Sequence, residues 1–199
     1  MNSVISRDGT RIAYDELGGG PPVILVGGAF NTRTFGPNKG LAPLLEEHFT
    51  VINYDRRGRG GSTDTAPYAV EREIEDLEAL IEVSGGSAHV FGISSGAALA
   101  LEAANSGLAI EKLALYEAPF IVDDSRAPVP DDYLPKLEGM LAADRRNAAI
   151  RLFLRQGVGV PAVFVAMMRM MPVWSKLKAV APTIIYDATL VNDYRRGEP

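Results

Sequence analysis

The chain has 199 residues, of which 47% are hydrophobic, which is enough to bury one substantial core in a single domain or in a domain with a small appendage. Its net charge of -5 argues against a general nucleic-acid surface, which needs clustered and unopposed Lys and Arg, and favours a small or neutral ligand. The absence of cysteine excludes disulfides, thiolate catalysis and cysteine-based zinc sites.

The amino terminus shows no sign of targeting to or across a membrane. Residues 1–8 lack a basic stretch followed by an apolar core, and no run approaches the roughly 18 apolar residues of a spanning helix. We therefore expect no membrane span and a cytoplasmic location.

The first part of the chain alternates strand and helix patterns. Two short runs, residues 4–6 and 11–14, flank Asp8-Gly9 and predict an antiparallel hairpin. Continuous apolar runs, as at residues 23–26, predict strands buried on both faces. In chain order we expect a strand over 23–26, a helix over 41–48, a strand over 50–55, a helix over 70–83, a strand over 88–91, a helix over 97–106 and a buried strand over 113–116. Such alternation indicates an α/β fold with a doubly wound, mainly parallel sheet.

The pattern changes from about Asp123, where a polar, proline-containing link over residues 123–130 leads into a region without strand signals. We expect helices over 133–143, 145–156 and 161–171, and a polar, exposed end at 195–199. Four methionines gather in the third helix, at positions 167, 168, 170 and 171. They are interpreted as filling gaps in a core or, alternatively, as an adaptable wall over an apolar substrate site.

The strongest functional signal is Gly92-Ile93-Ser94-Ser95-Gly96, which follows an expected strand and opens an expected helix. In that context G-x-S-x-G is typical of a nucleophile elbow. The turn is tight, so Gly92 and Gly96 must lack side-chain bulk for the hydroxyl of Ser94 to stand clear.

Two further segments agree with the elbow. Residues 23–30 form a strand ending in a glycine turn, where a free backbone N–H could face a developing oxyanion, and residues 55–62 form a glycine-rich corner after the next strand. Together the three segments resemble the α/β-hydrolase family in order and spacing. The resemblance implies that Ser94 is the nucleophile and that the N–H groups of Ala29 and Ser95 form the oxyanion hole.

The same resemblance implies an α/β-hydrolase core over residues 1–122 and a helical cap over 123–199, inserted after the sixth strand. Members end with further strand–helix units that carry an acid and then a histidine, and we expect these units to be missing here. His89 lies on the strand before the elbow and His48 ends a helix at the opposite end of the sheet, so neither is expected to be the base. Glu117 is a weak candidate for the acid, and Asp123 and Asp124 are weaker still.

These residues lead us to expect a serine hydrolase, specifically a carboxylesterase for small or medium apolar esters. Its histidine would come from a companion C-terminal polypeptide, and this chain alone would be nearly inactive. Related chemistry on peroxides, lactones or carbon–carbon bonds stays open. The alternative is a truncated, non-catalytic member that binds a ligand or partner.

Other functional classes have little support. No phosphate-binding glycine motif follows a strand with its partner residues, and the Arg- and Gly-rich stretch at 56–61 is short and bordered by Asp55 and Asp64. The two histidines show no metal-ligand spacing. We expect no cofactor, no metal site and no nucleic-acid partner.

Overall fold

The computed structural model describes residues 1–121, 123 and 128–191. The chain divides into two compact units, Met1–Ala118 and Pro119–Pro199, and each is described by itself. The expected polar end at 195–199 and Asp124 lie outside the described residues.

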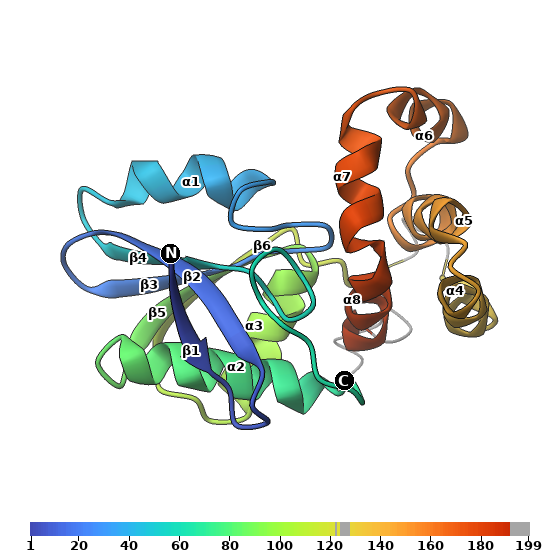
Figure 1. Cartoon of the computed structure of the whole chain (residues 1–199). Coiled ribbons are helices and arrows are strands. Elements are labelled where there is room, and N and C mark those ends of the chain that lie inside the picture. Colours follow the sequence, from blue (N-terminus) through green and yellow to red (C-terminus); the bar gives the residue numbers. More distant parts are fainter. Residues whose placement is uncertain (122, 124–127, 192–199) are drawn as a thin grey trace. The chain divides into compact units, whose positions relative to one another are not determined.

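The first unit is built on one six-stranded sheet with the strand order β1-β2-β4-β3-β5-β6 (Figure 1). β1 and β2 form the predicted hairpin, and β2 also runs antiparallel to β4, whereas β4, β3, β5 and β6 run parallel to one another. The predicted α/β class and mainly parallel sheet are confirmed. The strands are β1 Asn2–Ile5, β2 Arg11–Gly18, β3 Pro22–Val26, β4 Thr50–Tyr54, β5 Ala88–Ile93 and β6 Ile110–Tyr116.

Helices cover the two faces of this sheet. α1 lies on one face, and α2 and α3 lie on the other (Figure 1). The helices are α1 Pro37–Leu45, α2 Val70–Val83 and α3 Ser95–Asn105. α1 starts four residues before the predicted helix, because Pro37 occupies its first turn, where a proline loses no helical hydrogen bond.

The core of the first unit follows from the alternation of side chains along the strands. Under α1, Val23, Leu25 and Val51 pack with Ala42 of the helix. On β5, Ala88, Val90 and Gly92 are buried, whereas the residues between them, which point to the opposite face, are only half-buried. The α1 side of β5 is therefore incompletely covered.

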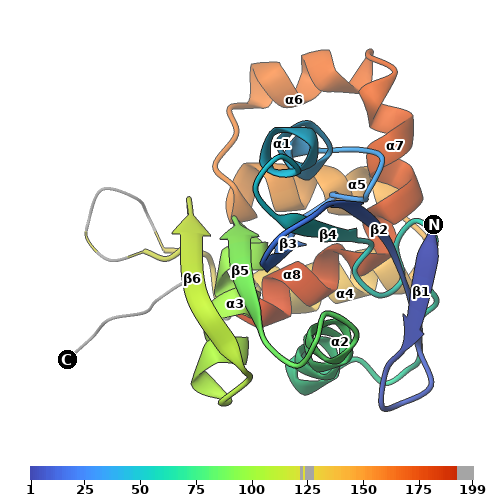
Figure 2. The ribbon, with the colours of Figure 1, turned by 90° about the vertical axis from the view of Figure 1, so that its left-hand side faces the viewer.

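β6 differs from the sequence prediction, which had residues 113–116 as a buried strand. Five of its seven residues are exposed, including Leu115 and Tyr116. Within the described residues β6 pairs with a strand on one side only, namely β5, so it forms an edge of the sheet. Figure 2 shows β5 and β6 side by side with their carboxyl ends pointing the same way.

The second unit is helical in its described part, as predicted. It contains α4 Tyr133–Ala142, α5 Arg146–Leu152, the π-helical turn η1 Phe153–Gly157, α6 Ala162–Arg169, α7 Val173–Val180, the 3₁₀ turn η2 Ala181–Thr183 and α8 Ile184–Val191. The predicted helix over 145–156 thus changes to a π-helical turn at Phe153. That this unit serves as a cap, and that further core strands are missing, stay predictions. None of the helices in the described ranges has the length and apolarity to cross a bilayer.

Candidate active site

Ser94 lies on the turn between β5 and α3. β5 ends at Ile93 and α3 begins at Ser95, so a single residue makes the change of direction. Its backbone has φ 55° and ψ -128°, a conformation that costs a residue with a side chain about 1–3 kcal/mol and that clusters at functional sites. The Ser94 N–H donates to the Tyr116 carbonyl at 3.0 Å, and its carbonyl accepts from the Ala97 N–H at 2.9 Å. Both neighbouring elements therefore hold the strained turn.

The two flanking glycines are needed for close packing. A Cβ on Gly92 would lie 2.6 Å from the Gly96 carbonyl oxygen and 2.7 Å from the Ala97 Cα. A Cβ on Gly96 would overlap the Val26 carbonyl oxygen at the end of β3. The start of α3 thus lies directly against two neighbouring strands, and only glycine allows this approach.

The glycine turn after β3 reaches the same place. β3 and β5 are neighbours, with Val26 paired to Gly92, so the turns that follow them meet at one edge of the sheet. A Cβ on Gly28 would lie 2.9 Å from the Cβ and 3.4 Å from the Oγ of Ser94. The structure therefore brings Gly28, the residue before Ala29, next to Ser94.

Two buried arginines hold the carbonyl groups of this turn. Arg59 Nη1 donates to the Gly28 carbonyl at 2.8 Å and Arg56 Nη1 to the Gly27 carbonyl at 3.3 Å. The Gly28 carbonyl also accepts from the Asn31 N–H at 3.2 Å. In a trans peptide the C=O of one residue and the N–H of the next point in opposite directions. By fixing the Gly28 carbonyl, Arg59 therefore fixes the direction of the Ala29 N–H.

The sequence reasoning treated residues 55–62 as a tight corner and missed this role of its arginines. The signal was present as three arginines in a short stretch after a strand, but this stretch was interpreted only as a tight corner. All three are almost completely buried in the structure, Arg59 at 1% exposure.

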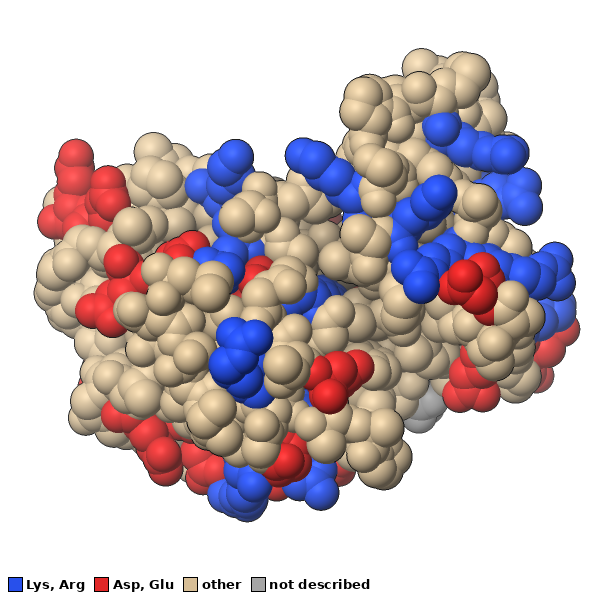
Figure 3. Space-filling view, in the orientation of Figure 1, with Lys and Arg blue, Asp and Glu red and all other residues tan. Residues whose placement is uncertain are grey.

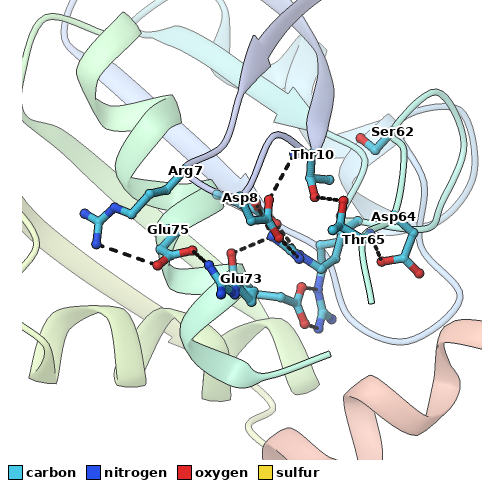
Figure 4. Close-up of polar contacts among 12 residues, drawn as sticks. Arg7, Asp8, Thr10, Ser62, Asp64, Thr65, Glu73 and Glu75 are labelled. Carbon is cyan, nitrogen blue, oxygen red and sulfur yellow. Dashed lines mark hydrogen bonds and ion pairs between the residues drawn. The ribbon is translucent and has the colours of Figure 1, made fainter. Parts of the chain in front are cut away.

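Ion pairs attach this corner to α2 and to the hairpin (Figure 4, in which Asp8 and Glu73 are labelled). Arg56 makes a bidentate pair with Glu73, with both distances at 2.6 Å. Arg57 makes a bidentate pair with Asp76 at 2.8 and 2.9 Å and a further bond to Asp8 at 2.9 Å. Buried charges are tolerated only when they are paired in this way.

These pairs set the protonation of the carboxyl groups. Burial alone would raise the pKa of Glu73, but the Arg56 charge and hydrogen bonds hold that pKa below its ordinary value. For Asp8 the hydrogen bond from Arg57 also prevails over burial and lowers the pKa to about 2. Hydrogen bonds to Asp76 likewise raise the pKa of Arg57 although burial opposes this. At Asp76, by contrast, burial prevails over the hydrogen bond from Arg57 and raises the pKa of the carboxyl group.

The two histidines of the chain lie away from Ser94. His89 is near the amino end of β5, five residues before Ser94, which at about 3.3 Å per strand residue is about 16 Å. Its ring packs edge-on against Phe49, and its Nδ1 lies 3.7 Å from Glu111 Oε2. His48 is exposed in the turn before β4. Both occupy the ends of strands opposite the elbow, so neither reaches the Ser94 hydroxyl.

The three acid candidates lie in different parts of the chain. Glu117 directly follows β6 at the same edge of the sheet as Ser94, is exposed, and has a positive φ of 52°. Asp123 belongs to the second unit, and Asp124 lies outside the described residues. In the described part of the chain no group of three or more His, Cys, Asp or Glu side chains is arranged to hold a metal ion.

Comparison with known proteins decides the family. A sequence profile described as "Alpha/beta hydrolase family" matches residues 18–197. The chain belongs to the alpha/beta hydrolase family. The crystal structure of an alpha/beta hydrolase from Sphaerobacter thermophilus is 54% identical and superposes with a TM-score of 0.93 over 98% of this chain and 75% of that one.

Two further proteins share less sequence with this chain. An uncharacterized hydrolase of Bacillus subtilis, YraK, is 34% identical over 106 residues, which is 51% of this chain and 38% of the relative. The esterase RhEst1 from Rhodococcus shares 19% identity with a TM-score of 0.65, over 96% of this chain and 72% of that one, which shows the fold alone. The match to YraK thus covers well under half the length of that relative.

Proposed function

We propose that this alpha/beta hydrolase is a serine carboxylesterase for small or medium apolar esters, with Ser94 as its nucleophile. The observation that carries the proposal is the strained conformation of Ser94 at the end of β5, with the Gly28–Ala29 turn against its side chain. An esterase needs a serine hydroxyl that stands clear of the sheet beside backbone N–H donors.

In the proposed reaction, Ser94 Oγ attacks the ester carbonyl carbon while its proton passes to a histidine. The carbonyl oxygen becomes an oxyanion that accepts hydrogen bonds from the Ala29 and Ser95 N–H groups. The C–O bond to the alcohol then breaks, and the histidine returns its proton to the departing alcohol oxygen. Water attacks the acyl-enzyme by the same route in reverse and releases the acid.

The histidine must come from outside this chain, because both of its own histidines lie at the opposite end of the strands. We propose that a companion C-terminal segment supplies it together with the acid. Two surfaces support this. β6 is an exposed sheet edge with Leu115 and Tyr116 uncovered, and the α1 side of β5 is only half-buried. One further strand–helix unit would cover both.

The test combines intact mass under denaturing conditions with labelling by a fluorophosphonate, which reacts with an activated serine. We expect a second polypeptide in the preparation and a label on Ser94. Ser94→Ala should abolish labelling and ester hydrolysis while the circular-dichroism spectrum is unchanged. Unchanged hydrolysis by Ser94→Ala would disprove the assignment of the nucleophile.

The distance of both histidines from Ser94 favours one alternative, a non-catalytic member of the family that binds a ligand or a partner. A single species of 21.4 kDa that stays unlabelled would support this alternative and contradict the esterase proposal.

A further inference from the structure

Basic residues greatly outnumber acidic ones in residues 145–191 of the second unit. Between residues 145 and 191 there is one acidic residue, Asp187, which is buried. The same segment contains seven basic residues, Arg145, Arg146, Arg151, Arg155, Arg169, Lys176 and Lys178. The whole chain, by contrast, has a net charge of -5. Figure 3 shows Lys and Arg side chains gathered over the helices of this unit.

Three of these arginines line one pocket. Arg151 and Arg155 come from α5 and the π-helical turn, and Arg169 comes from the end of α6. The pocket has a volume of about 450 Å³, within the range of small-molecule sites. Arg151 also borders a neighbouring pocket whose charged lining is Asp144, Arg145, Arg146 and Lys178, so basic side chains outnumber acidic ones there too.

The pocket arginines differ from several other arginines of the chain, which are paired. Arg33, Arg56 and Arg57 each pair with a carboxylate, and Arg146 pairs with Asp144 at 2.7 Å. Among the described residues, Arg151, Arg155 and Arg169 have no carboxylate within ion-pair distance. Three guanidinium groups around one pocket repel one another, and a bound anion would relieve that repulsion. Guanidinium groups bind carboxylate and phosphate with two parallel hydrogen bonds.

The rest of the pocket wall is apolar. It is formed by α6 and the residue after it, with Ala162, Val165, Ala166 and Met170 facing the arginines. A purely ionic ligand such as inorganic phosphate would leave this wall uncovered. A ligand with a carboxylate or phosphate head and an apolar chain would pair with the arginines and also cover the apolar wall. The π-helical turn at Arg155 fits such a site, because these turns occur often at functional positions.

We propose that the pocket between α5 and α6 binds an anionic amphiphile, with its head on Arg151, Arg155 and Arg169 and its chain along the apolar side of α6. The site lies wholly within the second unit and does not depend on Ser94. The ligand is either a free amphiphile or an anionic lipid in a bilayer, since both present the same chemistry.

The test uses the purified chain as it is and calorimetry with decyl phosphate below its micelle-forming concentration. We expect saturable binding of one molecule per chain, and at least about tenfold weaker binding of inorganic phosphate, which lacks the apolar chain. A parallel arm measures co-sedimentation with vesicles of phosphatidylcholine alone or with phosphatidylglycerol. Binding only to the vesicles with phosphatidylglycerol identifies the lipid source. Binding neither to free decyl phosphate nor to these vesicles overturns the proposal.

Matched variants separate the pocket from general charge. Arg151→Gln/Arg155→Gln/Arg169→Gln should weaken binding at least about tenfold. Lys39→Gln/Lys112→Gln/Lys136→Gln removes the same charge from exposed lysines outside the pocket and should bind as the wild type does. Ala166→Trp keeps all three arginines but fills the pocket, and should also lose binding. Equal losses in the two triple variants, or normal binding by folded Ala166→Trp, would refute the site. Ser94→Ala should bind decyl phosphate as the wild type does. A negative result for the pocket can therefore be distinguished from a negative result for the esterase proposal.

Discussion

At the scale of single residues, Ser94 and Arg59 show two ways in which the fold prepares a site. Ser94 is held in a conformation that its side chain disfavours, and neighbouring elements bear the strain through hydrogen bonds. Arg59 contacts none of the atoms proposed to react; it positions the peptide that carries the proposed oxyanion donor. The first residue was evident from a motif, and the second required the structure.

The strain at Ser94 predicts a difference between two substitutions that both remove the hydroxyl. Glycine adopts positive φ freely, whereas alanine does not. We expect Ser94→Gly to be more stable than Ser94→Ala by about 1 kcal/mol in the free energy of unfolding, measured with urea. Equal stabilities would mean that the turn stores no such strain.

The hydrogen bond from Arg59 predicts a functional effect without direct contact. Arg59→Lys keeps the charge but not the guanidinium geometry, so the Ala29 N–H loses its fixed direction. In the preparation that carries the companion segment we expect fluorophosphonate labelling to slow by about tenfold or more, with a lower kcat for ester hydrolysis and a similar KM. Arg72→Lys, which alters a more exposed pair with Glu75, is the control and should label normally. Normal labelling of Arg59→Lys would refute the positioning role.

At the scale of elements, the arrangement of the first unit depends on two kinds of contact. One is the close approach of a helix to a strand, and the other is the ion pairing that joins a loop to its neighbours. α3 can begin against β3 only because position 96 has no side chain. The corner after β4 is joined to α2 and to the β1–β2 hairpin by buried ion pairs. These contacts fix the turns around Ser94.

The close contact at Gly96 predicts that a change of glycine to alanine affects stability differently at two helical positions. Gly96→Ala places a methyl group on the Val26 carbonyl and should lower the free energy of unfolding by about 2–4 kcal/mol. Gly139, on α4, has nothing within 4 Å of its potential Cβ, so Gly139→Ala should be neutral or stabilising by up to about 1 kcal/mol. Thermal melts of the two variants measure the difference, and a stable Gly96→Ala would contradict the close approach.

The Asp8–Arg57 pair predicts that the free energy of unfolding depends on pH. The pKa of Asp8 falls from 3.8 to about 2 on folding, so its contribution is fully present above pH 4 and is lost as the pH falls through 2. Asp8→Asn should therefore cost about 1–2 kcal/mol at pH 7, after allowance for solvent screening, and almost nothing near pH 2. Urea melts across this range measure it. A difference that does not change with pH would show that Asp8 acts through packing rather than charge.

At the scale of the whole molecule, the first unit presents an open edge. The carboxyl half of β6 is apolar and exposed, with Leu115 at 42% and Tyr116 at 54%. Long, exposed and apolar sheet edges recruit other strands. The edge is therefore a surface that a companion segment would cover and that otherwise promotes self-association.

This edge predicts the behaviour of the chain without a companion. We expect self-association that increases with concentration, measured by size-exclusion chromatography with light scattering, and less of it in Tyr116→Lys, because a lysine opposes pairing at a strand edge. Leu44→Lys, which removes an apolar side chain of α1 with 74% exposure, is the control and should associate as the wild type does. If the two variants behave alike, association does not involve β6.

The sequence alone was sufficient for the α/β class, the N-terminal hairpin, the helical second unit and the serine turn. The reason is that alternation, apolar runs and glycine spacing are local properties of a chain. It was also sufficient to doubt both histidines. His48 precedes a strand and His89 lies on the strand that leads into the elbow, so neither is expected to reach Ser94.

Only the tertiary structure decided which charges are buried and which strand is an edge. In the sequence, Arg56 and Arg59 are only part of a glycine-rich corner. Their burial depends on Glu73 and the Gly27–Gly28 carbonyls, which lie far along the chain. Residues 113–116 have the composition of a buried strand, yet burial requires neighbours on both sides, and among the described residues β6 pairs with β5 alone. Pairing and burial are relations between distant segments, so they arise from packing rather than from local pattern.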